Sequence, residues 1–226
     1  MQRSRFCESV HAGPRGDGAS LPAFVTCLEI QRPMFETPIA AGAIPPSYDA
    51  LTLTLTRPAF LKGLADQAQL AQRSGNVFCL LLLDVDHLQS INDCHGITAG
   101  DDVLGGLADR CRRVIAEPAW HRSEYTLGRY DGGALLVLAR PCASSQAEML
   151  AEALRFAVAE KPLGDRISAT VSIGVAQFRI GESVDEVLAR TERVLHVAKQ
   201  FGRDRVEVAN TPPSRVERAK VVGLYG

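Results

Sequence analysis

The chain has 226 residues, of which 46% are hydrophobic, and its 25 Lys and Arg against 26 Asp and Glu give a formal net charge of -1. This length and composition suit one domain with a single core, and the balanced charge gives no reason to expect a nucleic-acid partner. No apolar run approaches the ~20 residues of a membrane span, and no signal-peptide pattern follows the N-terminal arginines. The six cysteines lack the CxxC spacing of a zinc site. We therefore expect a soluble, cytoplasmic protein that has reduced thiols and does not contact a membrane.

The two ends of the chain differ in composition from its middle. Residues 1–47 are rich in Gly and Pro, which predicts a largely disordered N-terminal arm. An apolar patch at residues 24–30 either docks on the domain or a partner, or belongs to a mobile leader. Residues 210–226 are predicted to form a polar C-terminal tail, which leaves a regular domain at residues 48–209.

Hydrophobic periodicity predicts alternating helices and strands through that domain. The helices expected from an apolar stripe fall within residues 55–71, from about residue 87, and at 99–115, 146–159 and 184–200. Continuous or alternating apolar runs predict strands at 77–85, 125–130, 135–139, 167–178 and 205–209. This alternation indicates an α/β fold in which helices cover a central sheet.

The segment RYDGGALLVL, residues 129–138, predicts a hairpin inside that sheet. Asp131, Gly132 and Gly133 mark a turn, and the apolar run at 135–138 follows it. Asp-Gly between strand-like segments is a strong hairpin signal.

Polar residues follow several of the predicted elements. Asp84 and Asp86 end a buried strand, where carboxylates could hold Mg²⁺, although Asp86 could equally cap the next helix. Asn92 and Asp101 belong to a polar stretch able to read a base edge. Lys199 and Arg203 lie around the end of a helix, where cations also complement the helix dipole.

Four motifs in the observed order resemble the GGDEF family of diguanylate cyclases. They are DVDHLQSINDCHGITAGDDVL (84–104), RYDGGALLVL, TVSIGVAQF (170–178) and VLHVAKQFGRDRV (194–206), and DALTLTLTRPAF (49–60) is similar to the family's opening DxLTxLxNRxxF. The resemblance covers residues 48–209. It implies a fold like the class III nucleotidyl cyclase catalytic core, with a central, mostly antiparallel sheet flanked by helices.

The resemblance also implies a chemistry. In the family, two GTP-loaded domains face each other and form cyclic di-GMP with two metal ions per site. By position, Asp84 and the Val85 carbonyl correspond to metal ligands, and Asn92 and Asp101 to guanine contacts. Lys199 and Arg203 correspond to residues that grip the β- and γ-phosphates.

The signature turn departs from the family's Gly-Gly-Asp/Glu-Glu-Phe. The five positions are Asp131, Gly132, Gly133, Ala134 and Leu135 in this chain, so both carboxylates are missing in either register. Without a metal carboxylate, phosphoryl transfer loses most of its machinery. Asp131 also brings a negative charge toward the phosphates, although Asp is common in tight turns for structural reasons.

The family's inhibitory RxxD motif is only half kept. Arg122 is present, and Tyr125 replaces the Asp. Smaller departures are Leu88 and Gln89 in place of Phe-Lys, Ile97 in place of His, and His196 in place of Tyr.

Two functions follow from the sequence. The first is a catalytically degenerate diguanylate cyclase-like domain that binds a nucleotide or a protein in cyclic di-GMP signalling. Its expected partners are GTP or cyclic di-GMP, a signalling protein or a second copy of the chain, with Mg²⁺ as a possible cofactor through Asp84 and the nucleotide. The alternative is an active diguanylate cyclase with a non-standard signature turn.

Overall fold

The structure is a computed structural model that describes residues 44–164 and 167–209. Most of the predicted N-terminal arm and the whole predicted C-terminal tail lie outside these residues. Within the described ranges, none of the helices combines the length and apolarity that crossing a bilayer requires.

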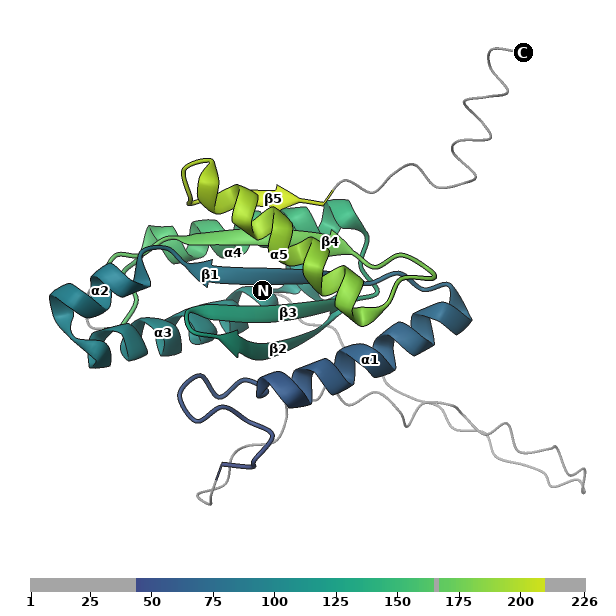
Figure 1. Cartoon of the computed structure of the whole chain (residues 1–226), viewed down its shortest axis with the longest axis horizontal. Helices are drawn as coiled ribbons and strands as arrows, with labels where there is room; N and C mark the ends of the chain where they lie inside the picture. Colours follow the sequence, from purple (N-terminus) through teal and green to yellow (C-terminus); the bar gives the residue numbers. More distant parts are fainter. Residues whose placement is uncertain (1–43, 165–166, 210–226) are drawn as a thin grey trace, which may run out of the picture. The chain divides into compact units, whose positions relative to one another are not determined.

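The described domain combines helices and strands along the chain (Figure 1). The helices are α1 (Arg57–Ser74), α2 (Leu88–His95), α3 (Ile97–Ile115), a short 3₁₀ turn η1 (Pro118–Trp120), α4 (Ser144–Glu160) and α5 (Val184–Gln200). The strands are β1 (Cys79–Val85), β2 (Glu124–Asp131), β3 (Ala134–Arg140), β4 (Val171–Gln177) and β5 (Val206–Val208).

The strands form one sheet in the order β2-β3-β1-β4-β5. The pairs β2–β3, β3–β1 and β1–β4 are antiparallel, and only β4–β5 is parallel. The prediction of a mostly antiparallel sheet flanked by helices is confirmed. The predicted hairpin is also present, as β2 and β3.

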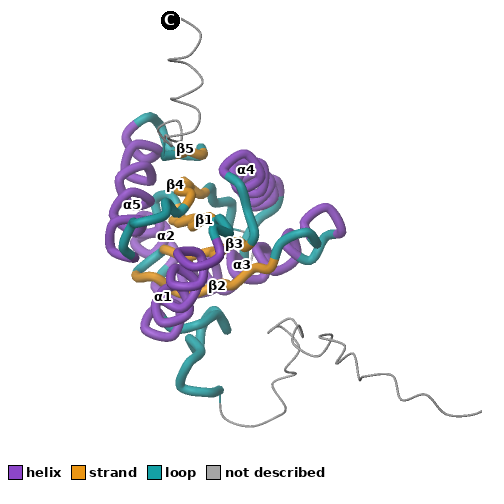
Figure 2. Tube along the Cα trace, turned by 90° about the vertical axis from the view of Figure 1, so that its right-hand side faces the viewer, coloured by secondary structure: helices purple, strands orange, loops and turns teal. Residues whose placement is uncertain are grey.

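Two hydrophobic cores lie on the two faces of the sheet. One core joins the sheet to α3 and α4, and the other joins it to α1 and α5. Figure 2 shows the strands between these two helical layers. Along β1, Leu81 and Leu83 belong to the first core, while Leu80 and Leu82 belong to the second. Full burial on both faces explains why β1 is apolar without alternation.

Several predicted element ends were wrong by a few residues, and at three of them backbone groups have partners outside the element. Leu55 exchanges hydrogen bonds with Leu127 and Arg129 beside β2, so α1 begins only at Arg57. The Val77 carbonyl accepts from Cys142, and β1 begins at Cys79. The strand predicted at 167–178 is shorter, since Ile167 pairs with Leu163 and β4 spans only Val171–Gln177.

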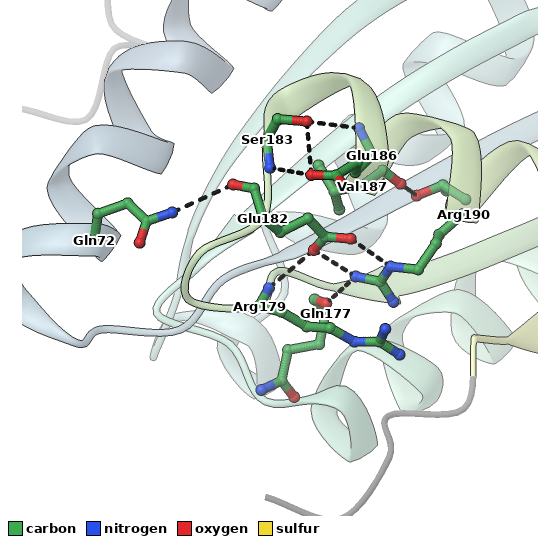
Figure 3. A network of polar contacts seen from close by, with 9 residues as sticks. Gln72, Gln177, Arg179, Glu182, Ser183, Glu186, Val187 and Arg190 are labelled. Carbon is green, nitrogen blue, oxygen red and sulfur yellow. Dashed lines mark hydrogen bonds and ion pairs between the residues drawn. The ribbon is translucent and has the colours of Figure 1, made fainter. Parts of the chain in front are cut away.

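A buried ion pair fixes the start of α5 to the end of β4 (Figure 3). The Arg190 Nε and Nη2 atoms donate to the two Glu182 carboxylate oxygens at 2.6 and 2.8 Å, and Nη2 also donates to the Gln177 carbonyl at 2.6 Å. Glu182 also accepts from the Arg179 amide at 3.0 Å, and its carbonyl accepts from Gln72 of α1 at 3.2 Å. The side chains of Arg190 and Glu182 are only 10% and 8% exposed. This pair therefore joins α1, β4 and α5.

Replacing Arg190 by Ala should lower the free energy of unfolding by about 3–5 kcal/mol, because it leaves Glu182 buried and unpaired. Arg155→Ala is the matched control, since Arg155 forms partly exposed ion pairs with Glu152 and Asp204 and should cost only about 0–1 kcal/mol. Urea unfolding followed by circular dichroism measures both values. Equal losses in the two variants would contradict the prediction.

Candidate functional site

The carboxyl end of β1 gathers the polar side chains that the sequence singled out. In Figure 1 this end lies beside the β2–β3 turn, α2 and the last turn of α5. The Lys199 Nζ atom of α5 lies 2.7 Å from Asp84 Oδ2 in an ion pair whose side chains are 32% and 23% exposed. A predicted metal ligand and a predicted phosphate contact are thus direct neighbours.

The signature turn is tighter than the sequence indicated. Asp131 is the exposed last residue of β2, Ala134 is the buried first residue of β3, and only Gly132 and Gly133 form the turn. Gly132 has a φ of 37°. The Gly133 carbonyl accepts from the Val85 amide at 3.2 Å, which holds the turn against the end of β1.

Gly133 stands where a second carboxylate would meet Asp84. A Cβ added to Gly133 would lie 3.3 Å from Asp84 Oδ1 and 2.9 Å from Leu88 Cδ2. A side chain at this position would therefore point at Asp84, and the flexible end of Leu88 would have to move for it. The side chain beside Asp84 at this position is therefore the apolar Leu88 and not a group with an oxygen ligand for a metal.

The donor set at this end is small for a metal. Within residues 44–164 and 167–209, no group of three or more His, Cys, Asp or Glu side chains is placed to hold an ion. Mg²⁺ in nucleotide sites needs only one or two protein carboxylates besides the phosphates. Asp84 could thus coordinate one Mg²⁺ ion bound to a nucleotide, but the residues present do not fit a site for two metal ions.

Asn92 and Asp101 lie where α2 and α3 meet. Asn92 Oδ1 is buried and has no hydrogen-bond partner. A Cβ on Gly100 would lie 1.8 Å from that oxygen, so only glycine allows α3 to approach Asn92 this closely. Asp101 is the next residue of α3 and is partly buried. Both side chains carry acceptor oxygens, and the Asn92 oxygen faces Gly100 of α3.

Arg203 lies in the turn between α5 and β5, and Asp86 holds that turn. Asp86 is 3% exposed. Its Oδ1 accepts from Ser172 Oγ at 2.7 Å, and its Oδ2 accepts from Thr170 Oγ1 at 2.7 Å and from the Asp204 amide at 3.0 Å. The alternative that Asp86 caps α2 is wrong, because His87 occupies the cap position without a side-chain cap bond.

Sequence reasoning did not find a second polar cluster near the turn. Arg57 Nη2 donates to Tyr130 Oη at 3.3 Å, and Tyr130 Oη donates to Glu192 of α5. The Arg57 guanidinium also lies 4.3 Å from the Tyr130 ring centroid. Burial and the Glu192 carboxylate raise the pKa of Tyr130 to about 12. The retained Arg57 was the only sequence signal for this link between α1, β2 and α5.

Arg122 lies away from the other predicted residues. Arg122 is exposed and lies just before β2. The first residue of β2, Glu124, pairs with Arg140, and the last residue of β2, Asp131, pairs with Ala134 beside the turn. Eight strand residues place Arg122 more than about 20 Å from the turn along β2. Any ligand contact of Arg122 is thus separate from the Asp84 site.

Comparison with known proteins identifies the family. A protein-family sequence model described as "Diguanylate cyclase, GGDEF domain" matches residues 46–205. Diguanylate cyclase DgcP of Pseudomonas aeruginosa is 33% identical over 164 residues, which cover 71% of this chain and 24% of that protein. The chain spans less than half the length of the curated relatives it matches.

Solved structures agree with this match. The GGDEF domain of DgcB from Caulobacter crescentus, in complex with c-di-GMP, is 31% identical with a TM-score of 0.66, covering 73% of this chain and 94% of that one. Diguanylate cyclase SiaD in complex with its activator SiaC from Pseudomonas aeruginosa is 29% identical with a TM-score of 0.66, covering 73% and 62%. The sequence match and the shared fold together show that this chain belongs to the GGDEF domain family of diguanylate cyclases.

Proposed function

We propose that this GGDEF domain is a catalytically silent module that binds a guanine nucleotide in cyclic di-GMP signalling. The observation that carries the proposal is Gly133, which directs no carboxylate at Asp84. Family members use Mg²⁺ and need positioned ions to neutralise charge in the transition state of phosphoryl transfer. A single carboxylate that is already paired with Lys199 falls short of the metal ligands that turnover needs.

The proposed binding role rests on groups that remain in place. The Asp101 carboxylate and the Asn92 amide oxygen, once it turns away from Gly100, can accept from guanine, which carries N–H donors on its Watson–Crick edge. Lys199 and Arg203 supply positive charge for phosphates. The expected ligands are GTP at this site and cyclic di-GMP, with Arg122 as the retained half of the inhibitory motif.

Protein partners are part of the same proposal. SiaD, a structural relative, is seen in complex with its activator SiaC, so a GGDEF protein can take a signalling protein as partner. A second copy of this chain is the other expected partner, as in the family's face-to-face arrangement. We place the module's output in such contacts because the signature turn lacks its carboxylates.

The wild-type protein should make no cyclic di-GMP from GTP with Mg²⁺ or Mn²⁺. The combined changes Asp131→Gly, Gly133→Asp and Ala134→Glu test the scaffold, and turnover should then appear because a carboxylate returns beside Asp84. The same triple variant with Gly133→Asn is the control, since it has nearly the same size but no charge. Chromatographic product analysis measures turnover, and robust synthesis by the wild type would establish the active-cyclase alternative.

Asn92→Ala should weaken GTP binding about tenfold to a hundredfold, because a buried polar contact is worth about 1–3 kcal/mol. ATP binding should change less, since adenine lacks the N1–H donor of guanine. Asn76→Ala, in the loop after α1, is the control and should leave both affinities unchanged. Calorimetric titration with each nucleotide decides. Equal affinities for GTP and ATP that Asn92→Ala leaves unchanged would contradict the role of Asn92 in guanine recognition.

Asp131→Asn should raise GTP affinity, because it removes a negative charge while keeping size and turn preference. Asp131 pairs with Ala134, which pairs with Asp84, so these residues lie in one row across three strands. The gain should be larger at low salt, since the screening length is about 30 Å at 0.01 M and about 8 Å near 0.15 M. Titration of both proteins at the two salt concentrations tests this. Weaker binding by the variant would mean that Asp131 assists the ligand.

A further inference from the structure

The turn between α5 and β5 has an unusual backbone. Two consecutive non-glycine residues have positive φ values, 63° at Arg203 and 43° at Asp204. Non-glycine residues in this left-handed region carry strain that nearby contacts must offset. Contacts with the surrounding residues therefore hold the turn in this conformation. The same contacts determine the backbone position of Arg203.

Three contacts meet at this turn. The Arg203 amide donates to the Ala198 carbonyl at 3.1 Å, which closes the end of α5. The Asp204 side chain forms an ion pair at 2.8 Å with Arg155 of α4, a pair that is 42% and 25% exposed. The Asp204 amide donates to the Asp86 carboxylate at 3.0 Å, and Asp86 is almost completely buried. Of the three contacts, the bond to Asp86 has the most deeply buried charged partner, so water weakens it least.

Asp86 is itself fixed from the sheet. Thr170 directly precedes β4 and Ser172 is its second residue, and each hydroxyl donates to a different Asp86 oxygen. The Asp86 amide also donates to the Thr170 carbonyl at 2.9 Å. With both oxygens occupied by protein donors, Asp86 has little capacity left for a metal ion. Its bonds connect the end of β1, the start of β4 and the turn that carries Arg203.

We infer that Asp86 is a positioning residue for phosphate binding: its buried carboxylate holds the left-handed turn and thereby fixes the backbone that carries Arg203. The role in ligand binding rests on the proposed nucleotide site. The role in holding the turn rests only on the contacts of Asp86 and can be measured without a ligand.

The first experiment measures amide hydrogen exchange in the free protein. The Asp204 amide should be protected in the wild type and should exchange at least about tenfold faster in Asp86→Ala, which removes its acceptor. Asp86→Asn should retain most of the protection, because a carbonyl oxygen can still face Asp204. Ser172→Ala is the control: it removes one buried bond to the other Asp86 oxygen and should leave the Asp204 amide protected.

If Asp86→Ala does not fold, Asp86→Glu moves the carboxylate by one methylene and should loosen the turn in the same direction. An unprotected Asp204 amide in the wild type, or full protection in both of these variants, overturns the inference.

The second experiment compares GTP with guanosine by calorimetric titration. Asp86→Ala should weaken GTP about tenfold and leave guanosine unchanged, because only the phosphates meet Arg203. The double variant with Asp86→Ala and Arg203→Ala should bind GTP no more weakly than Arg203→Ala alone, since both changes remove the same phosphate contact. Additive losses, or an equal loss for guanosine, would show a general structural role and refute positioning.

The two experiments separate two kinds of failure. Absence of GTP binding by the wild type refutes the proposed nucleotide site and the ligand part of this inference, while the exchange result still decides whether Asp86 holds the turn.

Discussion

The register of β1 is the constraint on which the site depends. This strand is hydrogen-bonded on both sides, with Asp84 opposite Ala134 of β3 and Ser172 of β4. Because side chains alternate along a strand, Asp84 falls on the same face as Leu80 and Leu82, beneath α5. A slip of one residue would send this carboxylate to the opposite face. The packing of two cores therefore fixes the position of the polar site.

The ion pair between Asp84 and Lys199 shapes what this site can bind. Nucleotide phosphates that reach Lys199 must compete with Asp84 for its charge. The pair is partly exposed, and such pairs are worth only about 0–1 kcal/mol, so the competition is weak. Under the proposed function, Lys199 therefore remains available to phosphates, and the absence of a carboxylate at Gly133 bears on metal-assisted chemistry.

Local patterns predicted most of the fold, and long-range contacts account for the errors. Helix α5 begins at Val184 and ends at Gln200, as predicted, because its apolar stripe is regular and Ser183 caps it. The role of Asp86 escaped prediction, since its partners Thr170 and Asp204 lie 84 and 118 residues away. Two hydroxyl residues alternating at the start of β4 were the only local signal. The sequence likewise identified the missing carboxylates, but not that Gly133 packs against Leu88 beside Asp84.

The elements that carry Lys199 and Arg203 have anchors outside the β2–β3 turn. Helix α5 is fixed at its start by the buried pair of Arg190 and Glu182, and the turn after it is fixed by Asp86. Along its length, α5 packs so closely on β4 that a Cβ on Gly174 would lie 2.5 Å from the Thr191 carbonyl oxygen. None of these contacts involves the β2–β3 turn. The positions of Lys199 and Arg203 therefore do not require an acidic residue in the signature turn, which is why the proposed function can separate nucleotide binding from catalysis.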